Sequence, residues 1–308
     1  MPIFSETALR KLENLSLVAN SVRIGGMKGD RHSRKRGSAI EFADYREYSP
    51  GDDLRRIDWN VLARLDRPFI KLTEEEEELV VHILVDTSTS MDWPPANELD
   101  DSPTNKLRYA ILLAGALGYL GLSSGDLVNT MLFNQSGTRS WGPFRGRKNG
   151  WPLLEFLEVN YNALSNQNNA PPRLTSLESA LYDYAQQAKR PGLLLLLSDM
   201  LTPQNYATGL STLLARGHQV TLLHIQSPDE LAPNYDGDLK LIDVETGEAA
   251  EITIDPMVLE AYSARFDEWR SGIVSFCETR NINYISITTE IPWDKLVMEF
   301  LREQGIVR

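Results

Sequence analysis

The fold is decided by one stretch, Leu84-Val85-Asp86-Thr87-Ser88-Thr89-Ser90-Met91. The apolar residues 79–85 end at an acid, and serines follow two and four positions after it. A buried strand that ends in this way can present one carboxylate and two hydroxyls to a hard divalent cation. Mg²⁺ prefers about six oxygen ligands at roughly 2.0–2.1 Å, so other groups would have to complete the shell. Serine and threonine after an aspartate also form ordinary turns, and both interpretations stay open from this stretch alone.

The composition is that of a folded globular protein. The chain has 308 residues, of which 42% are hydrophobic and 24% charged, enough for one large or two smaller domains. Its net charge of −12 disfavours nucleic-acid binding, which needs a surplus of cations on one face. A single cysteine, Cys277, excludes an internal disulfide and is interpreted as a buried core thiol. Because no apolar run reaches about 18 residues and no signal peptide is recognisable, we expect no membrane span and a cytoplasmic location.

Two compositional regimes meet near Glu74. Residues 1–73 are polar with short β-type pieces, and we expect an N-terminal segment packed on the core domain. Within it, residues 23–36 are rich in arginine and lysine, which indicates either a solvated loop or a docking site for an acidic partner. Residues 74–78 are five consecutive glutamates, which we interpret as a solvated rim.

Residues 74–308 alternate apolar strands with helices, which predicts a doubly wound α/β domain with a mainly parallel sheet. The expected strands are short apolar runs, as in a sheet covered on both faces, at residues 79–85, 127–133, 192–197, 219–225 and 284–287. Helix starts are predicted at Asn105, at Thr175 with Glu178, at Thr202-Pro203 and at Asp255-Pro256. Residues 160–172 are predicted to be a loop, and residues 239–254 an inserted β-hairpin.

Three distant parts of the chain are predicted to meet at one edge of this sheet. Ligands of doubly wound folds bind beyond the carboxyl ends of the strands. Asp86 follows the first strand, and Asp199 follows the apolar run 192–197. Thr175 begins the helix before that strand, so its hydroxyl is expected on the same edge. Thr175 equally fits a helix cap, and Asp199 could cap the following helix.

The order and spacing of these residues resemble the von Willebrand factor A domain. The resemblance rests on Asp86-x-Ser88-x-Ser90, on Thr175 ahead of Ala180-Leu181, and on Asp199 after its strand. It implies a metal-ion-dependent adhesion site in which Ser88 and Ser90 bind the ion. It also implies that Thr175 is sometimes a direct ligand, and that Asp86 and Asp199 act directly or through water. It further implies that an acidic side chain of a partner supplies the last ligand.

A second resemblance covers nearly the whole chain. The block Glu41-Phe42-Ala43-Asp44-Tyr45-Arg46-Glu47-Tyr48-Ser49-Pro50-Gly51-Asp52-Asp53-Leu54-Arg55-Arg56-Ile57-Asp58-Trp59 is similar to the bacterial family known as domain of unknown function 58. Members commonly accompany AAA+ ATPases of the MoxR type, which implies such a partner. The opposite charges of residues 41–64 fit either a structural clamp, irregular and not helical, or a docking surface.

Three functions remain to be distinguished. The first is a non-enzymatic, Mg²⁺-dependent protein-binding module that serves as adaptor to a MoxR-type ATPase; Mn²⁺ or Ca²⁺ would suit the same oxygens. The second is a Mg²⁺-dependent hydrolase or phosphotransferase that uses Asp86 and Asp199. Against it, there is no glycine-lysine phosphate loop. His82 lies within a predicted strand, and the other three histidines lack a motif context: His32, His218 and His224. The third is a structural scaffold that holds no ion.

Overall fold

The computed structural model describes residues 4, 17, 42–49, 57–73, 79–95, 104–134, 136–165, 177–202, 205–243, 247–303 and 306–307. The chain forms two compact units. One comprises Met1–Ile24 and Leu79–Arg308, and the other comprises Gly25–Glu78. Each unit is described below by itself, and the expected packing of residues 1–73 on the core stays a prediction.

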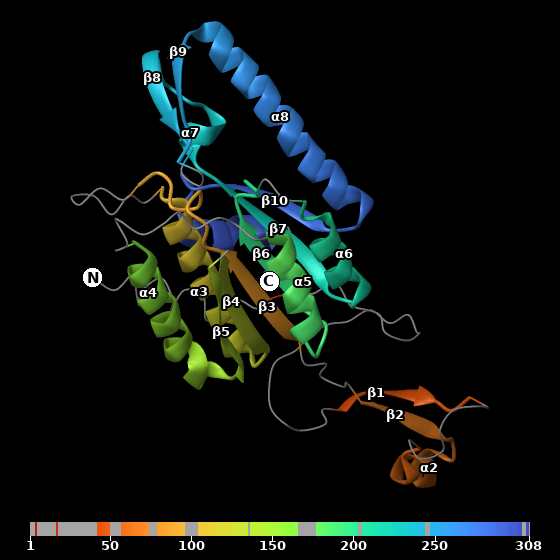
Figure 1. The fold of residues 1–308 in the computed structure, drawn as a ribbon. Helices are drawn as coiled ribbons and strands as arrows, with labels where there is room; N and C mark the ends of the chain where they lie inside the picture. The colour runs from red at the N-terminus through yellow and green to blue at the C-terminus, as the bar shows by residue number, and fades with distance from the viewer. Residues whose placement is uncertain are drawn as a thin grey trace. The chain divides into compact units, whose positions relative to one another are not determined.

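A six-stranded sheet forms the centre of the larger unit, in the order β10-β7-β6-β3-β4-β5 (Figure 1). All neighbouring strands are parallel except β4 and β5, which confirms the predicted doubly wound, mainly parallel α/β fold. The chain enters at β3 and places later strands on both sides of it, so the strand order reverses there. The strands are β3 (Val80–Asp86), β4 (Leu127–Asn134), β5 (Gly137–Arg145), β6 (Leu193–Ser198), β7 (Gln219–Gln226) and β10 (Asn283–Thr288).

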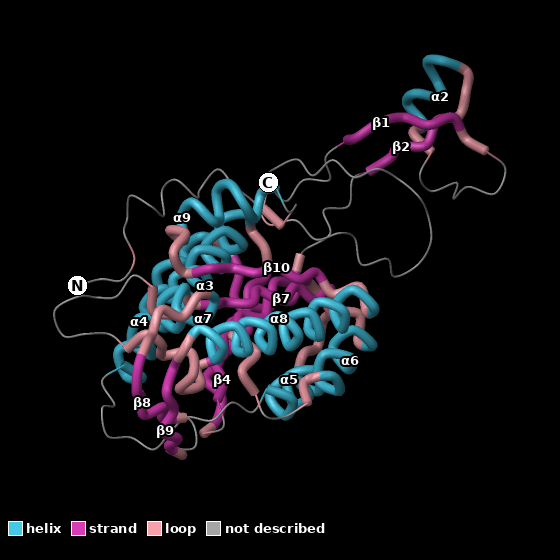
Figure 2. The backbone as a smooth tube through the Cα atoms, turned by 90° about the horizontal axis from the view of Figure 1, so that it is seen from above, coloured by secondary structure: helices cyan, strands magenta, loops and turns pink. Residues whose placement is uncertain are grey.

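Helices cover both faces of the sheet (Figure 2). Side chains alternate between faces along a strand, and the core is divided accordingly. On β6, Leu195 packs in the cluster that includes α3 and α4, whereas Leu194 and Leu196 pack in the cluster that includes α5, α6 and α8. The helices are α3 (Lys106–Ser124), η2 (Arg147–Asn149), α4 (Gly150–Ser165), α5 (Leu177–Gln187), α6 (Ala207–Ala215), α7 (Pro228–Leu231), α8 (Pro256–Thr279), α9 (Trp293–Lys295), η3 (Leu296–Phe300) and α10 (Leu301–Glu303).

Helix α3 is apolar on all sides and lies in the core, as expected for a helix surrounded by protein. Two of its glycines allow close packing. A Cβ at Gly118 would lie 2.4 Å from the Leu153 side chain, and one at Gly115 would lie 2.3 Å from the ring of Phe4. The helix is long and apolar enough to cross a membrane, but 83% of the relevant window is buried inside the protein. Core helices of folded domains meet the same criterion.

Several predicted boundaries are confirmed and others are wrong. Asn105 caps α3 and Asp255 caps α8, each by accepting a backbone N–H with its side chain. Helix α6 begins at Ala207 and not at Thr202-Pro203. Helix α4 continues to Ser165, so residues 160–165 are helical and not part of a loop. Strand β5 was not predicted, because this edge strand is mostly exposed and lacks an apolar pattern.

The predicted hairpin is present as β8 (Gly237–Ile242) and β9 (Ala249–Ile254), which pair antiparallel. It follows α7 and leads into α8, and it extends beyond the sheet with the first part of α8 (Figure 1). Leu241 and Ile242 on β8 are exposed.

The smaller unit is more regular than expected. Strand β1 (Phe42–Glu47) pairs antiparallel with β2 (Phe69–Thr73). Helix α2 (Trp59–Leu65) lies between them in the chain, and the Asp58 carboxylate caps it by accepting from the backbone N–H groups of Asn60 and Val61. The expectation of an irregular, non-helical segment over residues 41–64 is therefore wrong for Phe42–Glu47 and Trp59–Leu65. Residues 50–56, which hold several of the opposite charges of this block, lie outside the described residues.

Candidate functional site

The carboxylate of Asp86 lies at the carboxyl end of β3, next to the end of β6. The register pairs Val85 with Leu197, which brings Asp86 beside Ser198. One Asp86 oxygen accepts the backbone N–H of Ser88 at 3.0 Å, and the other accepts the Ser198 hydroxyl at 2.9 Å. Only 1% of Asp86 is exposed. The end of the strand therefore fixes a buried carboxylate at the point where the strand order reverses.

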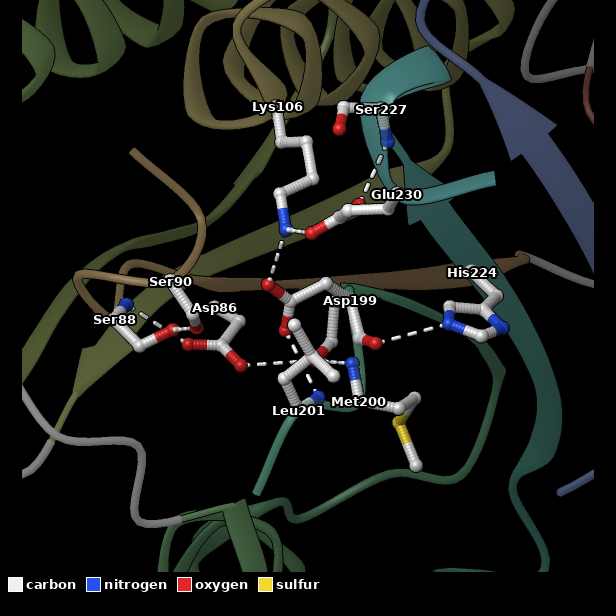
Figure 3. Close-up of polar contacts among 11 residues, drawn as sticks. Asp86, Ser88, Ser90, Lys106, Asp199, Met200, Leu201, His224, Ser227 and Glu230 are labelled. Atoms are coloured by element: carbon white, nitrogen blue, oxygen red, sulfur yellow. Dashed lines mark hydrogen bonds and ion pairs between the residues drawn. The ribbon is translucent and has the colours of Figure 1, made fainter. Parts of the chain in front are cut away.

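The hydroxyls of Ser88 and Ser90 lie together beside this carboxylate, and their oxygens are 3.0 Å apart (Figure 3). Thr87, between Asp86 and Ser88, points elsewhere and donates to the backbone oxygen of Phe133 at 3.0 Å. Two adjacent oxygens of an octahedral shell at Mg²⁺ bond lengths lie about 2.9 Å apart. The separation of the two serine oxygens thus matches one edge of such a shell.

Asp199 follows β6 and is held by three contacts. Its carboxylate accepts the backbone N–H of Leu201 at 3.0 Å, and its backbone oxygen accepts the Nε2–H of His224 at 2.9 Å. Its second carboxylate oxygen accepts the ammonium of Lys106 at 2.7 Å. The next residue, Met200, has a φ of 58°, which is uncommon outside glycine. This turn directs the N–H of Met200 to Ser198 and that of Leu201 to Asp199.

Lys106 was missed by sequence reasoning. It is the first residue of α3, its side chain is 0% exposed, and its Nζ lies 2.7 Å from Asp199 Oδ2 and 2.5 Å from Glu230 Oε1 (Figure 3). Burial alone would lower the pKa of Lys106, but the two carboxylates outweigh burial and raise it. One signal was available in the sequence, because a cation directly after a helix cap opposes the helix dipole. Such a local conflict indicates a tertiary or functional reason.

The charges of the described residues at this edge do not balance. Burial and the nearby charge of Asp199 raise the pKa of Asp86 to about 6, so the ionised form is disfavoured but still predominates at neutral pH. Among the residues that the structure describes, three carboxylates and one ammonium meet here, and when all are ionised they sum to two negative charges: Asp86, Asp199 and Glu230 with Lys106. A single divalent cation would neutralise them.

We refer to Asp86, Ser88, Ser90 and Asp199 as the carboxyl-edge site. The structure brings these four predicted residues to one edge of adjacent strands, whereas Thr175 lies outside the described residues. Across the described ranges, no group of three or more His, Cys, Asp or Glu side chains could hold a metal ion. A metal ion at this site would therefore need the serine hydroxyls and water as ligands in addition to the carboxylates. The spacing of the two serine oxygens suits such an ion.

Two of the described histidines, His82 and His224, have structural contacts through both ring nitrogens, and His218 directly precedes β7, at the opposite end of that strand from the carboxyl edge. His82 Nδ1 accepts the Tyr184 hydroxyl at 2.6 Å, and its Nε2 donates to the backbone oxygen of Arg190 at 3.1 Å. Burial, followed by the charge of His218, lowers the pKa of His82 to about 3. His224 similarly uses both ring nitrogens, on Asp199 and on the Tyr284 hydroxyl. Neither ring is placed as a base for a serine of the carboxyl-edge site; His32 lies outside the described residues.

Cys277 is buried, as the sequence suggested. Burial, with a smaller contribution from Glu278, raises the pKa of the Cys277 thiol to about 11. A thiol with this pKa is a poor nucleophile at neutral pH.

Comparison with known proteins finds relatives without an assigned activity. The family described as "Protein of unknown function DUF58" matches residues 44–271. Uncharacterized proteins of Mycobacterium tuberculosis and Mycobacterium bovis are each 25% identical to this chain over 291 residues, covering 94% of this chain and 87% of the relative.

Two solved structures are similar. One is described as an aerotolerance-related membrane protein from Bacteroides fragilis, with 16% identity, a TM-score of 0.43, and coverage of 73% of this chain and 99% of the other. The second is a conserved hypothetical protein BatB from Bacteroides thetaiotaomicron, with 13% identity, a TM-score of 0.43, and coverage of 74% and 98%. The expectation of a cytoplasmic location is contradicted by the description of the first structure as a membrane protein, and it is not carried further.

Proposed function

We propose a function for this chain, which belongs to the DUF58 family of proteins of unknown function. In this proposal the chain is a non-enzymatic, metal-dependent protein-binding module. The carboxyl-edge site holds Mg²⁺, and Mn²⁺ or Ca²⁺ can take its place. Thr175 is an additional ligand in this proposal, as the resemblance to the von Willebrand factor A domain implies. An acidic side chain of a partner protein completes the shell.

The observation that carries this proposal is the 3.0 Å separation of the Ser88 and Ser90 oxygens beside the Asp86 carboxylate. Two neutral hydroxyls in this arrangement serve as neighbouring ligands of one small cation. In a turn that is only structural, serine side chains bond mainly to nearby backbone groups. The Ser88 and Ser90 hydroxyls instead form a hydrogen bond with each other.

The ion would retain a strong attraction for an external carboxylate. The oxygens of Asp86 already accept N–H and O–H donors, and one oxygen of Asp199 accepts the Lys106 ammonium. These contacts reduce the negative charge that the protein offers to the ion. With few direct carboxylate ligands, the cation remains electrophilic, and a glutamate or aspartate of a partner is its preferred last ligand.

The partner in this proposal is an AAA+ ATPase of the MoxR type, as the family resemblance implies. A pull-down of such an ATPase by the immobilised chain tests it, with Mg²⁺, with a chelator, and with Ser88→Ala combined with Ser90→Ala. Asp126→Asn is the matched control, because Asp126 directly precedes Leu127, which pairs with Val80 at the opposite end of β3 from Asp86. Binding should require Mg²⁺ and both serines, and should survive Asp126→Asn. Equal recovery under all conditions refutes the metal-mediated interaction.

The alternative, a Mg²⁺-dependent hydrolase or phosphotransferase, has less support. Both Asp86 oxygens accept hydrogen bonds, and His82 and His224 bond to tyrosine hydroxyls and backbone oxygens. Hydrolysis of para-nitrophenyl phosphate in the presence of Mg²⁺, abolished by Asp86→Ala, would establish this alternative.

A further inference from the structure

We infer that Lys106 is a resident counter-cation of the carboxyl-edge site. It positions Asp199, connects the site to α7 and α8 through Glu230, and limits the affinity of the site for a divalent ion. The inference rests on the proposed function, because it concerns the same site. Lys106 acts through Asp199 and Glu230 and is a positioning residue, not a metal ligand.

The Lys106 ammonium is buried and contacts two carboxylates. Its ammonium donates to Asp199 Oδ2 at 2.7 Å and to Glu230 Oε1 at 2.5 Å, and the side chain is 0% exposed. The two acids come from distant parts of the chain, 93 and 124 residues away. A buried lysine is stable only when such partners compensate for its lost hydration. The fold therefore places a permanent positive charge beside one of the proposed ligands.

Glu230 extends this contact to the elements that follow β7. Its other carboxylate oxygen accepts the backbone N–H of Ser227 at 2.8 Å, which closes the first turn of α7. Its backbone oxygen accepts the hydroxyl of Tyr262, on α8, at 2.9 Å. One residue thus joins the Lys106 ammonium to α7 and to α8. The β8–β9 hairpin connects these two helices, so its base is attached to the site through this contact.

Lys106 and a divalent ion would compete for the same group, the carboxylate of Asp199. An ion that takes Asp199, directly or through water, meets a carboxylate that already carries an ammonium. The nearby positive charge also repels the ion. Without Lys106 the three carboxylates would carry three negative charges in place of a net two, so the ion-free protein would be less stable and the ion more tightly bound.

The experiment measures Mg²⁺ binding by calorimetry and thermal unfolding with Mg²⁺ or chelator, on the full chain. The variants are Lys106→Met, which keeps the length of the side chain without its charge, and Glu230→Gln. Lys148→Met is the control, because Lys148 is an exposed lysine on η2. Lys106→Met should lower Tm in chelator, enlarge the Mg²⁺-induced rise in Tm, and bind Mg²⁺ at least about tenfold more tightly. The control should match the wild type.

Glu230→Gln keeps the inference testable if Lys106→Met does not fold. It removes one negative charge and leaves the ammonium to Asp199 alone, so Mg²⁺ affinity should fall several-fold; unchanged or tighter binding contradicts the inference. If Lys106→Met binds Mg²⁺ with wild-type affinity, the inference is wrong and the proposed function stands. If Lys106→Met binds Mg²⁺ and the wild type does not, the inference is supported and the proposed metal function fails. If neither binds, both are overturned.

Discussion

Replacing Asp86 by asparagine should stabilise the ion-free protein. The charge of Asp86 is disfavoured because burial and Asp199 raise its pKa from 3.8 to about 6. A shift of this size corresponds to about 3 kcal/mol at neutral pH, at about 1.4 kcal/mol per pKa unit. Asparagine keeps the acceptor for the Ser88 N–H but fits the Ser198 hydroxyl less well, which costs about 1 kcal/mol. The expected net gain is therefore about 2 kcal/mol.

The same substitution should remove the response to Mg²⁺, because it deletes a ligand of the proposed ion. Thermal unfolding in chelator and in Mg²⁺ measures both effects on one sample. In chelator, Asp86→Asn should raise Tm by a few degrees. In Mg²⁺, the wild type should gain stability through binding of the ion to the native state, and the variant should not.

Asp126→Asn is the matched control for this experiment. Burial raises the pKa of Asp126 to about 7, against the opposing effect of Arg145. Its neutralisation should also stabilise the protein, but the Mg²⁺ response should remain. A rise in Tm with Mg²⁺ that is as large in Asp86→Asn as in the wild type refutes the reasoning, and so does a variant that is less stable than the wild type in chelator.

Three further predictions concern the fold. The unfolded chain takes up a proton at His82 below pH 6.5 and the native chain only near pH 3, so His82 should contribute a loss of about 2 kcal/mol of stability between pH 7 and pH 5. Urea unfolding of His82→Gln should show a pH dependence that lacks this contribution and keeps those of His218 and His224. A pH dependence identical to that of the wild type contradicts the prediction. Gly192→Ala should lower stability by about 3 kcal/mol, because its Cβ would lie 2.1 Å from the Val80 backbone oxygen. Gly272→Ala, with nothing within 4 Å, should be neutral or stabilising, and equal losses would refute the argument. Asp255→Ala should cost about 1 kcal/mol in urea unfolding by removing the α8 cap, and an unchanged midpoint would contradict this.

The sheet could be predicted because its central strands are continuous apolar runs. The residues of β3 and β6 are buried on both faces, and such runs have few other interpretations. The helix starts at Asn105 and Asp255 depend on side-chain caps that are local in sequence. Strand β5 could not be found in this way, since its pairing with β4 depends on backbone hydrogen bonds that leave little trace in side-chain hydrophobicity.

Part of the site could be predicted, because some of its residues are recognisable from the local sequence. The spacing of Asp86, Ser88 and Ser90 is local, and Asp199 was found from its position after a buried strand. The contacts of Lys106 with Asp199 and Glu230 span 93 and 124 residues, and no local pattern specifies them. The turn at Met200 was also missed, because a positive φ at methionine has no signature in the sequence.

The central claim is that Ser88 and Ser90 hold a divalent ion beside Asp86. Electron paramagnetic resonance of Mn²⁺ tests it most directly, because the signal of free Mn²⁺ falls as the ion binds. The account predicts one Mn²⁺ per wild-type chain, displaced by Mg²⁺, and loss of this binding when both serines are replaced by alanine. Equal Mn²⁺ binding by the wild type and the double variant, or none by the wild type, would contradict the account.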